Sequence, residues 1–331
     1  HRSNDIINAG EWTHLAPYRA GYDVKNAAVI DVPTLFHYGA LSSIISGLPS
    51  YATLYFYAVF LVLTTFLCAY MIIRKFNTQA ALYSLPIVLV FFMGMQAQVV
   101  TWGKWTYLTG AAGLIVYSWL LLYADKKYIP VFAGLVLGIT YTTHVVEALF
   151  GALLTIILYL AECVFEGYTM KQAMKAIHKY LVIASVFLVT SIYYAIEISV
   201  VRAGSYSHTF RSIENFTAFH ALQFFDYHWF IWVAVLVGVL ASIVLLAGKQ
   251  HYKYITIFGT LGFIFTLMNE VNFGGQFPFY MRLSWPVYLA FFFGLGLYSI
   301  ARFFPARKTV VFEASGFAIV ATIMVMIVSA S

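Results

Sequence analysis

The chain has 331 residues, of which 62% are hydrophobic and 10% are charged, and its formal net charge is +6. Soluble globular proteins contain about 45–50% apolar residues, so this composition excludes a soluble domain and indicates a polytopic membrane protein. In such a protein the positive balance fits cytoplasmic loops that face anionic lipid, and we expect no nucleic-acid partner.

The first 50 residues are mixed in character, whereas nearly all of the remainder is apolar. We therefore expect an extracytoplasmic first loop over residues 1–50, followed by a transmembrane helical domain over residues 51–331. The loop should contain short amphipathic helices on the membrane surface, one of them in the stretch "LFHYGAL" around His37. The chain starts at His1 without Met or the blocks of a signal peptide, so we expect sequence upstream of it.

Apolar segments follow one another along the rest of the chain, most of them close to the roughly 20 residues that a membrane-spanning helix needs. They lie near residues 51–73, 79–101, 105–124, 128–145, 147–165, 180–200, 228–248, 254–271, 281–301 and 309–330. The sequence thus predicts an all-α integral membrane protein of about ten transmembrane helices, placed in the cell or cytoplasmic membrane.

The connections between these segments alternate in charge. Every second connection is rich in lysine and arginine, and together these connections hold 12 of the 19 basic residues: 74–77, 125–127, 166–179, 249–253 and 302–308. Because basic residues concentrate on the cytoplasmic side of a membrane, we place this set inside. The other set then faces outside, and it includes the first 50 residues.

One apolar run, residues 128–161, is too long for a single membrane helix. Its 34 residues would extend about 51 Å at 1.5 Å per residue, against about 30 Å of hydrocarbon. Basic residues flank it on both sides, and only a pair of helices keeps both flanks on the same side. We therefore expect a hairpin whose turn falls at "THVVE", which places His144 and Glu147 at the outer edge of the membrane.

His144 and Glu147 are three residues apart and therefore neighbours on a helical face. One interpretation is a polar pair that lines an outer cavity and meets a substrate. The other is structural: Thr143 caps the second helix and Glu147 lies in its first turn. The two interpretations are compatible, and two ligands alone are too few for a zinc site.

The sequence contains no Walker motif, GxGxxG, HExxH or CxxC. This argues against nucleotide-driven transport, dinucleotide binding and zinc-protease chemistry. The two cysteines, Cys68 and Cys163, lie far apart in apolar segments, where we expect small membrane-buried side chains.

Two stretches of the first loop, "NDIINAGEW" and "VPTLFHYGALSSIISGLP", resemble the first extracytoplasmic loop of GT-C class glycosyltransferases. Those polytopic enzymes take a sugar from a polyprenyl-phosphate carrier. "TWGKWTYLTG", "TTHVVEALFG" and "FYMRLSWPVYL" are similar to later elements of the same class. The class usually has two prolines and a preceding lysine where this chain has Pro33 alone, so no role of that lysine is carried over.

The resemblance implies a catalytic carboxylate, which removes the proton of the acceptor hydroxyl, and cations that hold the carrier phosphate. By spacing, the acid of the class falls a few residues before His1, and Asp5 is a weak substitute within the chain. Further side chains on the predicted outer face are candidates for substrate binding: Arg2, Asp31, His37, Trp102, Lys104, His144, Glu147 and Arg282. Several also have a structural interpretation, as a turn residue (Asp31) or an interfacial anchor (Trp102, Arg282).

We therefore expect a membrane glycosyltransferase that moves a sugar from a polyprenyl-phosphate-linked donor to a lipid, glycan or protein acceptor on the extracytoplasmic side. Its other partners are membrane lipids, and the sequence leaves open whether a divalent metal takes part. One alternative is a secondary transporter or channel, in which Pro86, Gly110, Gly113 and Pro286 would break the helices. Another is a catalytically inactive relative that acts as a binding or assembly subunit.

Overall fold

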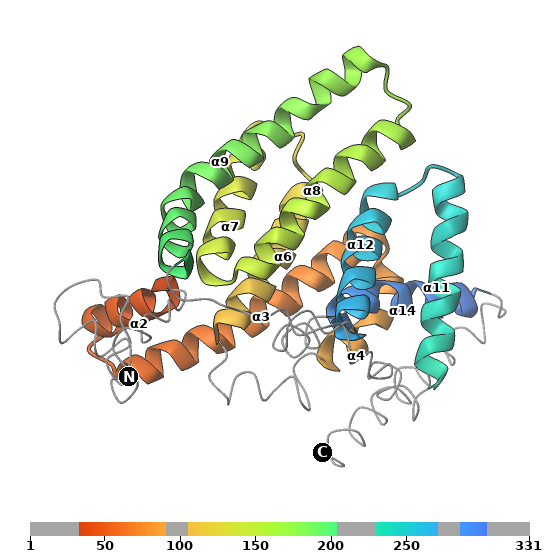
Figure 1. The fold of residues 1–331 in the computed structure, drawn as a ribbon. Helices are drawn as coiled ribbons and strands as arrows, with labels where there is room; N and C mark the ends of the chain where they lie inside the picture. The colour runs from red at the N-terminus through yellow and green to blue at the C-terminus, as the bar shows by residue number, and fades with distance from the viewer. Residues whose placement is uncertain (1–32, 91–104, 204–228, 271–284, 303–331) are drawn as a thin grey trace. The chain divides into compact units, whose positions relative to one another are not determined.

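A computed structural model describes residues 33–90, 105–203, 229–270 and 285–302 of the chain. These residues form ten helices and no strand (Figure 1). The helices are α2 (Pro33–Ser46), α3 (Ser50–Phe76), α4 (Thr78–Val90), α6 (Trp105–Leu121), α7 (Ile129–Thr143), α8 (Val145–Phe165), α9 (Met170–Ala203), α11 (Trp229–Ala247), α12 (Tyr252–Glu270) and α14 (Trp285–Ala301).

Each predicted apolar segment from 51–73 to 281–301 carries one helix, and the segment 309–330 lies outside the described residues. By length and composition, three helices are long and apolar enough to cross a membrane: Ser50–Phe76, Val145–Phe165 and Met170–Ile192. Four shorter apolar helices accompany them within the described ranges. The described residues are all-helical, and their apolar helices support an integral membrane protein, as the composition predicted.

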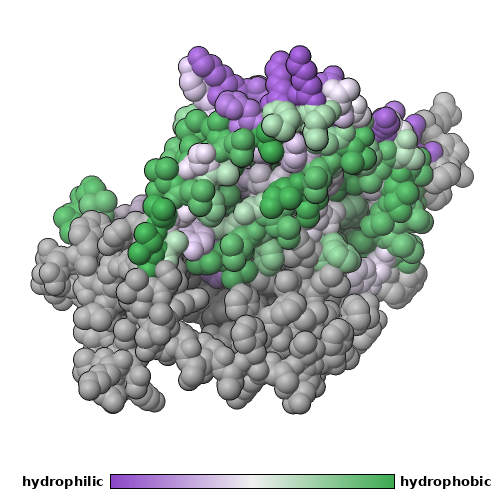
Figure 2. All heavy atoms as spheres, turned by 45° about the horizontal axis from the view of Figure 1, so that its top comes forward, coloured by the Kyte–Doolittle hydropathy of each residue, from purple (hydrophilic) through white to green (hydrophobic). Residues whose placement is uncertain are grey.

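Large apolar side chains lie exposed along the helices. Ile45, Val189 and Val244 are 77%, 78% and 72% exposed, a surface that water would penalise but lipid tails solvate. Figure 2 shows apolar residues along the exposed helix sides and hydrophilic residues gathered over helix ends. This distribution is the one that a bilayer imposes on helices that cross it.

The chain divides into two compact units, and α3, α8 and α9 each contribute to both. Unit 1 comprises residues 1–64, 99–152 and 178–209, and unit 2 comprises residues 65–98, 153–177 and 210–331. The predicted division at residue 50, between an outer loop and a membrane domain, remains a prediction.

In unit 1, α7 and α8 form the predicted hairpin. A Cβ atom on Gly151 would lie 2.5 Å from Leu137. Leu137 is seven residues before His144 and Gly151 is seven residues after it, so the two helices pack side by side from the turn. Helix α9 runs beside α7, where a side chain on Gly138 would overlap Thr190 (Figure 1). Glycines at these crossings let the helix backbones approach closely, as is common between membrane helices.

In unit 1, members of the two predicted sets of connections lie at opposite ends. At one end, Tyr57 near the start of α3 shares a hydrogen bond with Thr109 near the start of α6. At the opposite end, Lys179 donates a hydrogen bond of 2.5 Å to Asp125, so two of the basic connections meet there. The alternation predicted from charge is therefore present in unit 1, while the cytoplasmic or outer identity of each end remains a prediction.

In unit 2, α14 packs against α4, α11 and α12. A side chain on Gly238 would overlap the carbonyl oxygen of Phe292, and one on Gly296 would overlap that of Ala234. The α11–α14 crossing therefore brings two backbones into contact. The rings of Phe258 and Phe291 stack at 4.7 Å between α12 and α14.

Helix α9 starts ten residues earlier than the predicted span 180–200. Residues 170–203 contain no glycine or proline, and lysine, glutamine and alanine are good helix formers. The helix therefore continues without a break through the basic segment 171–179. Because this extension is basic rather than apolar, hydrophobicity alone does not predict it.

We expect Gly238→Ala to lower the free energy of unfolding by roughly 1–3 kcal/mol, the usual cost of overpacking, because the added methyl group overlaps the Phe292 carbonyl. The matched control is Gly259→Ala in α12, where the nearest side-chain atom is 3.8 Å from the added Cβ. That change should be neutral or stabilising by up to about 1 kcal/mol through helix propensity. Thermal unfolding of both variants in detergent measures the difference, and equal melting temperatures would contradict the close α11–α14 crossing.

Candidate functional site

The chain reverses direction at a single residue between α7 and α8. Thr143 ends α7, Val145 begins α8, and His144 between them has extended backbone angles, φ −153° and ψ 103°. Its N–H still donates to the Thr140 carbonyl at 2.7 Å, which closes the last turn of α7. A short turn of this kind leaves few backbone groups unpaired at the tip of the hairpin.

Thr143 does not cap α8, contrary to the structural interpretation of the sequence. Its hydroxyl donates back into α7, to the carbonyls of Ile139 and Thr140 at 3.0 Å each. His144 occupies the capping position instead. The correction arises because a threonine in the last turn of a helix can reach the carbonyls three and four residues before it.

Glu147 lies in the first turn of α8, as predicted, and it pairs with His144. Nδ1 of the imidazole and Oε2 of the carboxyl group share a short hydrogen bond. The Glu147 side chain is fully buried, whereas that of His144 is 17% exposed. The helix N-terminus favours negative charge at this position, and Glu147 Oε1 has no hydrogen-bond partner among the described residues.

Helix α6 covers the pair and fits around it through a glycine. A Cβ atom on Gly110 would lie 2.7 Å from His144 Cβ and 3.1 Å from Glu147 Oε2. One turn earlier, the fully buried ring of Tyr107 meets the imidazole edge-on, with centroids 5.9 Å apart. The site therefore has a fixed wall on one side and the partly exposed imidazole on the other.

Burial lowers the pKa of His144 to about 4, because the charged ring loses hydration. Nδ1 of the ring is held by Glu147, and the side chain is partly exposed. A histidine oriented by a carboxyl group is the arrangement that proteins use to bind or deprotonate a hydroxyl group.

A groove of about 350 Å³ lies between α2 and α3 in the same unit. It is lined by Tyr38, Ser42, Ser46, Leu48, Thr53, Phe56, Tyr57 and Phe60. The rings of Tyr38 and Tyr57 lie 4.5 Å apart, and the Thr53 hydroxyl donates to the Gly39 carbonyl at 3.5 Å. Aromatic walls with a few hydroxyl groups are typical of small-ligand sites.

The groove and the pair belong to the same end of unit 1. Tyr57, in the groove, shares a hydrogen bond with Thr109, and Thr109 precedes the Gly110 that contacts the pair. This end therefore combines a titratable dyad with an aromatic groove. Sequence reasoning missed Tyr57, Thr109 and Gly110, because aromatic and small residues in apolar segments also face lipid or pack against helices.

Of the predicted site residues, the structure brings His144 and Glu147 together. His37 belongs to α2, but its side chain is outside the described part of the chain. The remaining candidates fall in segments that the structure does not describe: Arg2, Asp5, Asp31, Trp102, Lys104 and Arg282. Within the described ranges no three His, Cys, Asp or Glu side chains gather into a metal site.

No family model and no curated protein matches the sequence. Among solved structures, the crystal structure of ArnT from Cupriavidus metallidurans bound to undecaprenyl phosphate is similar, with a TM-score of 0.62 and 14% sequence identity. The similarity covers 97% of this chain and 57% of the ArnT chain. ArnT is a GT-C glycosyltransferase, so the predicted resemblance to that class is confirmed at the level of the fold.

We expect His144→Ala to destabilise the protein by about 1–3 kcal/mol, because it leaves a buried carboxyl group without its partner. Glu147→Gln should cost less, since the amide keeps the shape and can still pair with the ring. His178→Ala is the matched control, because His178 is an exposed histidine on α9. Thermal unfolding of the three variants decides the matter: a His144→Ala protein as stable as the control would mean that the pair contributes nothing to the hairpin.

Proposed function

We propose that this chain carries the glycosyl-transfer site of a GT-C-type membrane enzyme. Its donor would be a polyprenyl-phosphate-linked sugar, and its acceptor a lipid, glycan or protein on the extracytoplasmic side. The observation that supports this most is the similarity of fold to ArnT over 97% of the chain. ArnT was solved with undecaprenyl phosphate bound, which favours a lipid-linked donor, and our chain spans 57% of the ArnT length.

The end of unit 1 that holds the dyad and the groove suits this chemistry. We assign His144 to contact with the acceptor hydroxyl or the carrier phosphate, with Glu147 as the positioning residue that orients the imidazole. The aromatic groove around Tyr38 and Tyr57 would take the sugar or the first units of the lipid. Transfer itself needs a base for the acceptor hydroxyl and cations for the leaving phosphate.

The remaining roles stay with the residues that the sequence proposed. The catalytic base would be the acid expected upstream of His1, or Asp5 in its place. Arg2, Lys104 and Arg282 would hold the phosphate, because guanidinium and ammonium groups pair well with it. Asp31, His37 and Trp102 would contact the acceptor or the carrier.

A second candidate is an inactive relative that uses the same fold to bind a lipid-linked sugar or to assemble with a partner. A fold alone does not fix an activity, and the expected acid falls before His1. The upstream sequence separates the two: an acid about five residues before His1, at the end of an apolar span, favours the enzyme.

The direct experiment is a transfer assay with the complete protein and a panel of radiolabelled polyprenyl-phosphate sugars. We expect transfer from one of these donors, its loss in Arg282→Ala, and a decrease of about tenfold in His144→Ala, which removes one proposed hydrogen bond to the substrate. His178→Ala, at an exposed position of α9, should keep wild-type activity. Absence of transfer with every donor, in a protein that is folded and binds them, would favour the inactive relative.

A further inference from the structure

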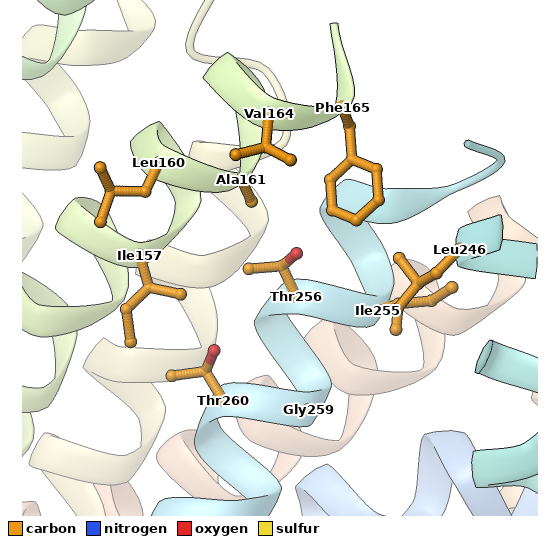
Figure 3. Close-up of a pocket in the computed structure, with 10 residues that line it drawn as sticks. All are labelled: Ile157, Leu160, Ala161, Val164, Phe165, Leu246, Ile255, Thr256, Gly259 and Thr260. Atoms are coloured by element: carbon orange, nitrogen blue, oxygen red, sulfur yellow. The ribbon is translucent and has the colours of Figure 1, made fainter. Parts of the chain in front are cut away.

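A second groove lies in unit 2, between the last turns of α8 and the first turns of α12. It has a volume of about 460 Å³. Ile157, Leu160 and Val164 line its α8 side, and Ile255, Thr256 and Thr260 line its α12 side. Figure 3 shows the Thr256 and Thr260 side chains directed from α12 toward α8, with Phe165 at the end of the groove where α8 ends.

The length of the groove matches one leaflet of a bilayer. Its α8 wall runs from Ile157 to Phe165, about 12 Å at 1.5 Å per residue. The hydrocarbon core is about 30 Å thick, so the groove extends through about half of it. The groove is open on one side, and at membrane depth an acyl chain is the molecule available to fill it.

The charged end of the groove is cationic. The chain continues from Leu246 on the groove wall into the loop 248–251, and α12 begins with Tyr252 and Lys253. The ring of His251 in this loop meets Phe76, the last residue of α3, at 4.8 Å. Lys249 and Lys253 belong to this end, and unit 2 carries further basic side chains in its other connections: Arg74, Lys75, Lys171 and Lys175.

Among the described residues at this end, Glu162 and Glu166 are acidic, and both are already engaged. Glu162 is buried and lies 3.6 Å from Lys253, and it also accepts a hydrogen bond of 3.4 Å from the Tyr168 hydroxyl. Glu166 accepts a hydrogen bond of 2.9 Å from Tyr252. These basic groups of unit 2 outnumber the two acids, and Lys171 and Lys249 are exposed.

From these observations we propose that the α8–α12 groove binds an anionic membrane phospholipid. One acyl chain occupies the groove, and the phosphate lies over the cationic end. An apolar groove of one leaflet's length that ends under basic side chains is complementary to a lipid of this kind in both shape and charge. The proposal is independent of the glycosyl-transfer site in unit 1, and a failure of one leaves the other standing.

Native mass spectrometry of the detergent-solubilised full chain tests the proposal with phosphatidylglycerol and phosphatidylcholine of identical acyl chains. We expect phosphatidylglycerol to be retained in preference. Ala161→Trp fills the groove and should abolish this retention. Ile156→Trp adds the same ring to α8 at a position that is 58% exposed and outside the groove, and it should bind like the wild type.

Two further variants test how much the basic side chains contribute to binding of the phospholipid. Lys171→Gln and Lys249→Gln should each weaken phosphatidylglycerol retention by about fivefold, without an effect on phosphatidylcholine. If Ala161→Trp elutes as an aggregate, Thr260→Phe is the second groove-filling variant. Equal retention of the two phospholipids, undiminished binding in a folded groove-filling variant, equal loss in Ile156→Trp, or retention of added polyprenyl phosphate alone would each overturn the proposal.

Discussion

The bilayer satisfies no backbone hydrogen bonds, and this constraint governs where the chain can turn. Each connection must lie at a membrane surface, because unpaired N–H and C=O groups cost several kcal/mol in hydrocarbon. An apolar run of 34 residues therefore has to break once, and the chain breaks at His144. The break carries a titratable pair to a helix end, where the imidazole is partly exposed while the carboxyl group stays buried. A site of chemical interest thus follows from a requirement on the backbone.

The same constraint separates the two kinds of polar chemistry in this chain. Along the helices, side chains are apolar, and close crossings depend on glycines such as Gly138 and Gly238 rather than on ion pairs. Polar groups gather at helix ends: the dyad and the aromatic groove at one end of unit 1, the Asp125–Lys179 pair at the other. In unit 2 Glu162 pairs with Lys253 at a distance of 3.6 Å. Function is expected at such ends, because they are where polar ligands and lipid headgroups reach the protein.

Much of the fold was predictable from hydrophobicity, and the site only in part. The break at His144 follows from segment length and flanking charge, and the His144–Glu147 contact follows from a spacing of three. The early start of α9 and the role of Thr143 were not predicted, because local hydrogen bonding and helix propensity decided them. The burial of Glu162 was not predicted either. A glutamate near the end of a helix is expected to be exposed, and the sequence does not show that Lys253 of another helix pairs with it. The roles of Tyr57, Thr109 and Gly110 depend on which helices pack against one another. The spacing of residues along the sequence does not reveal this.

We propose that the α7–α8 hairpin presents its tip to the outer surface and its basic end to the cytoplasm. Single cysteines at Thr142 and Lys127, in a protein whose Cys68 and Cys163 are replaced, mark the two ends of α7. A membrane-impermeant maleimide applied to intact cells should label the cysteine at 142 and spare the one at 127, which should react only after the membrane is opened. Labelling of position 127 alone in intact cells would contradict the account, because it would place the His144–Glu147 pair on the cytoplasmic side.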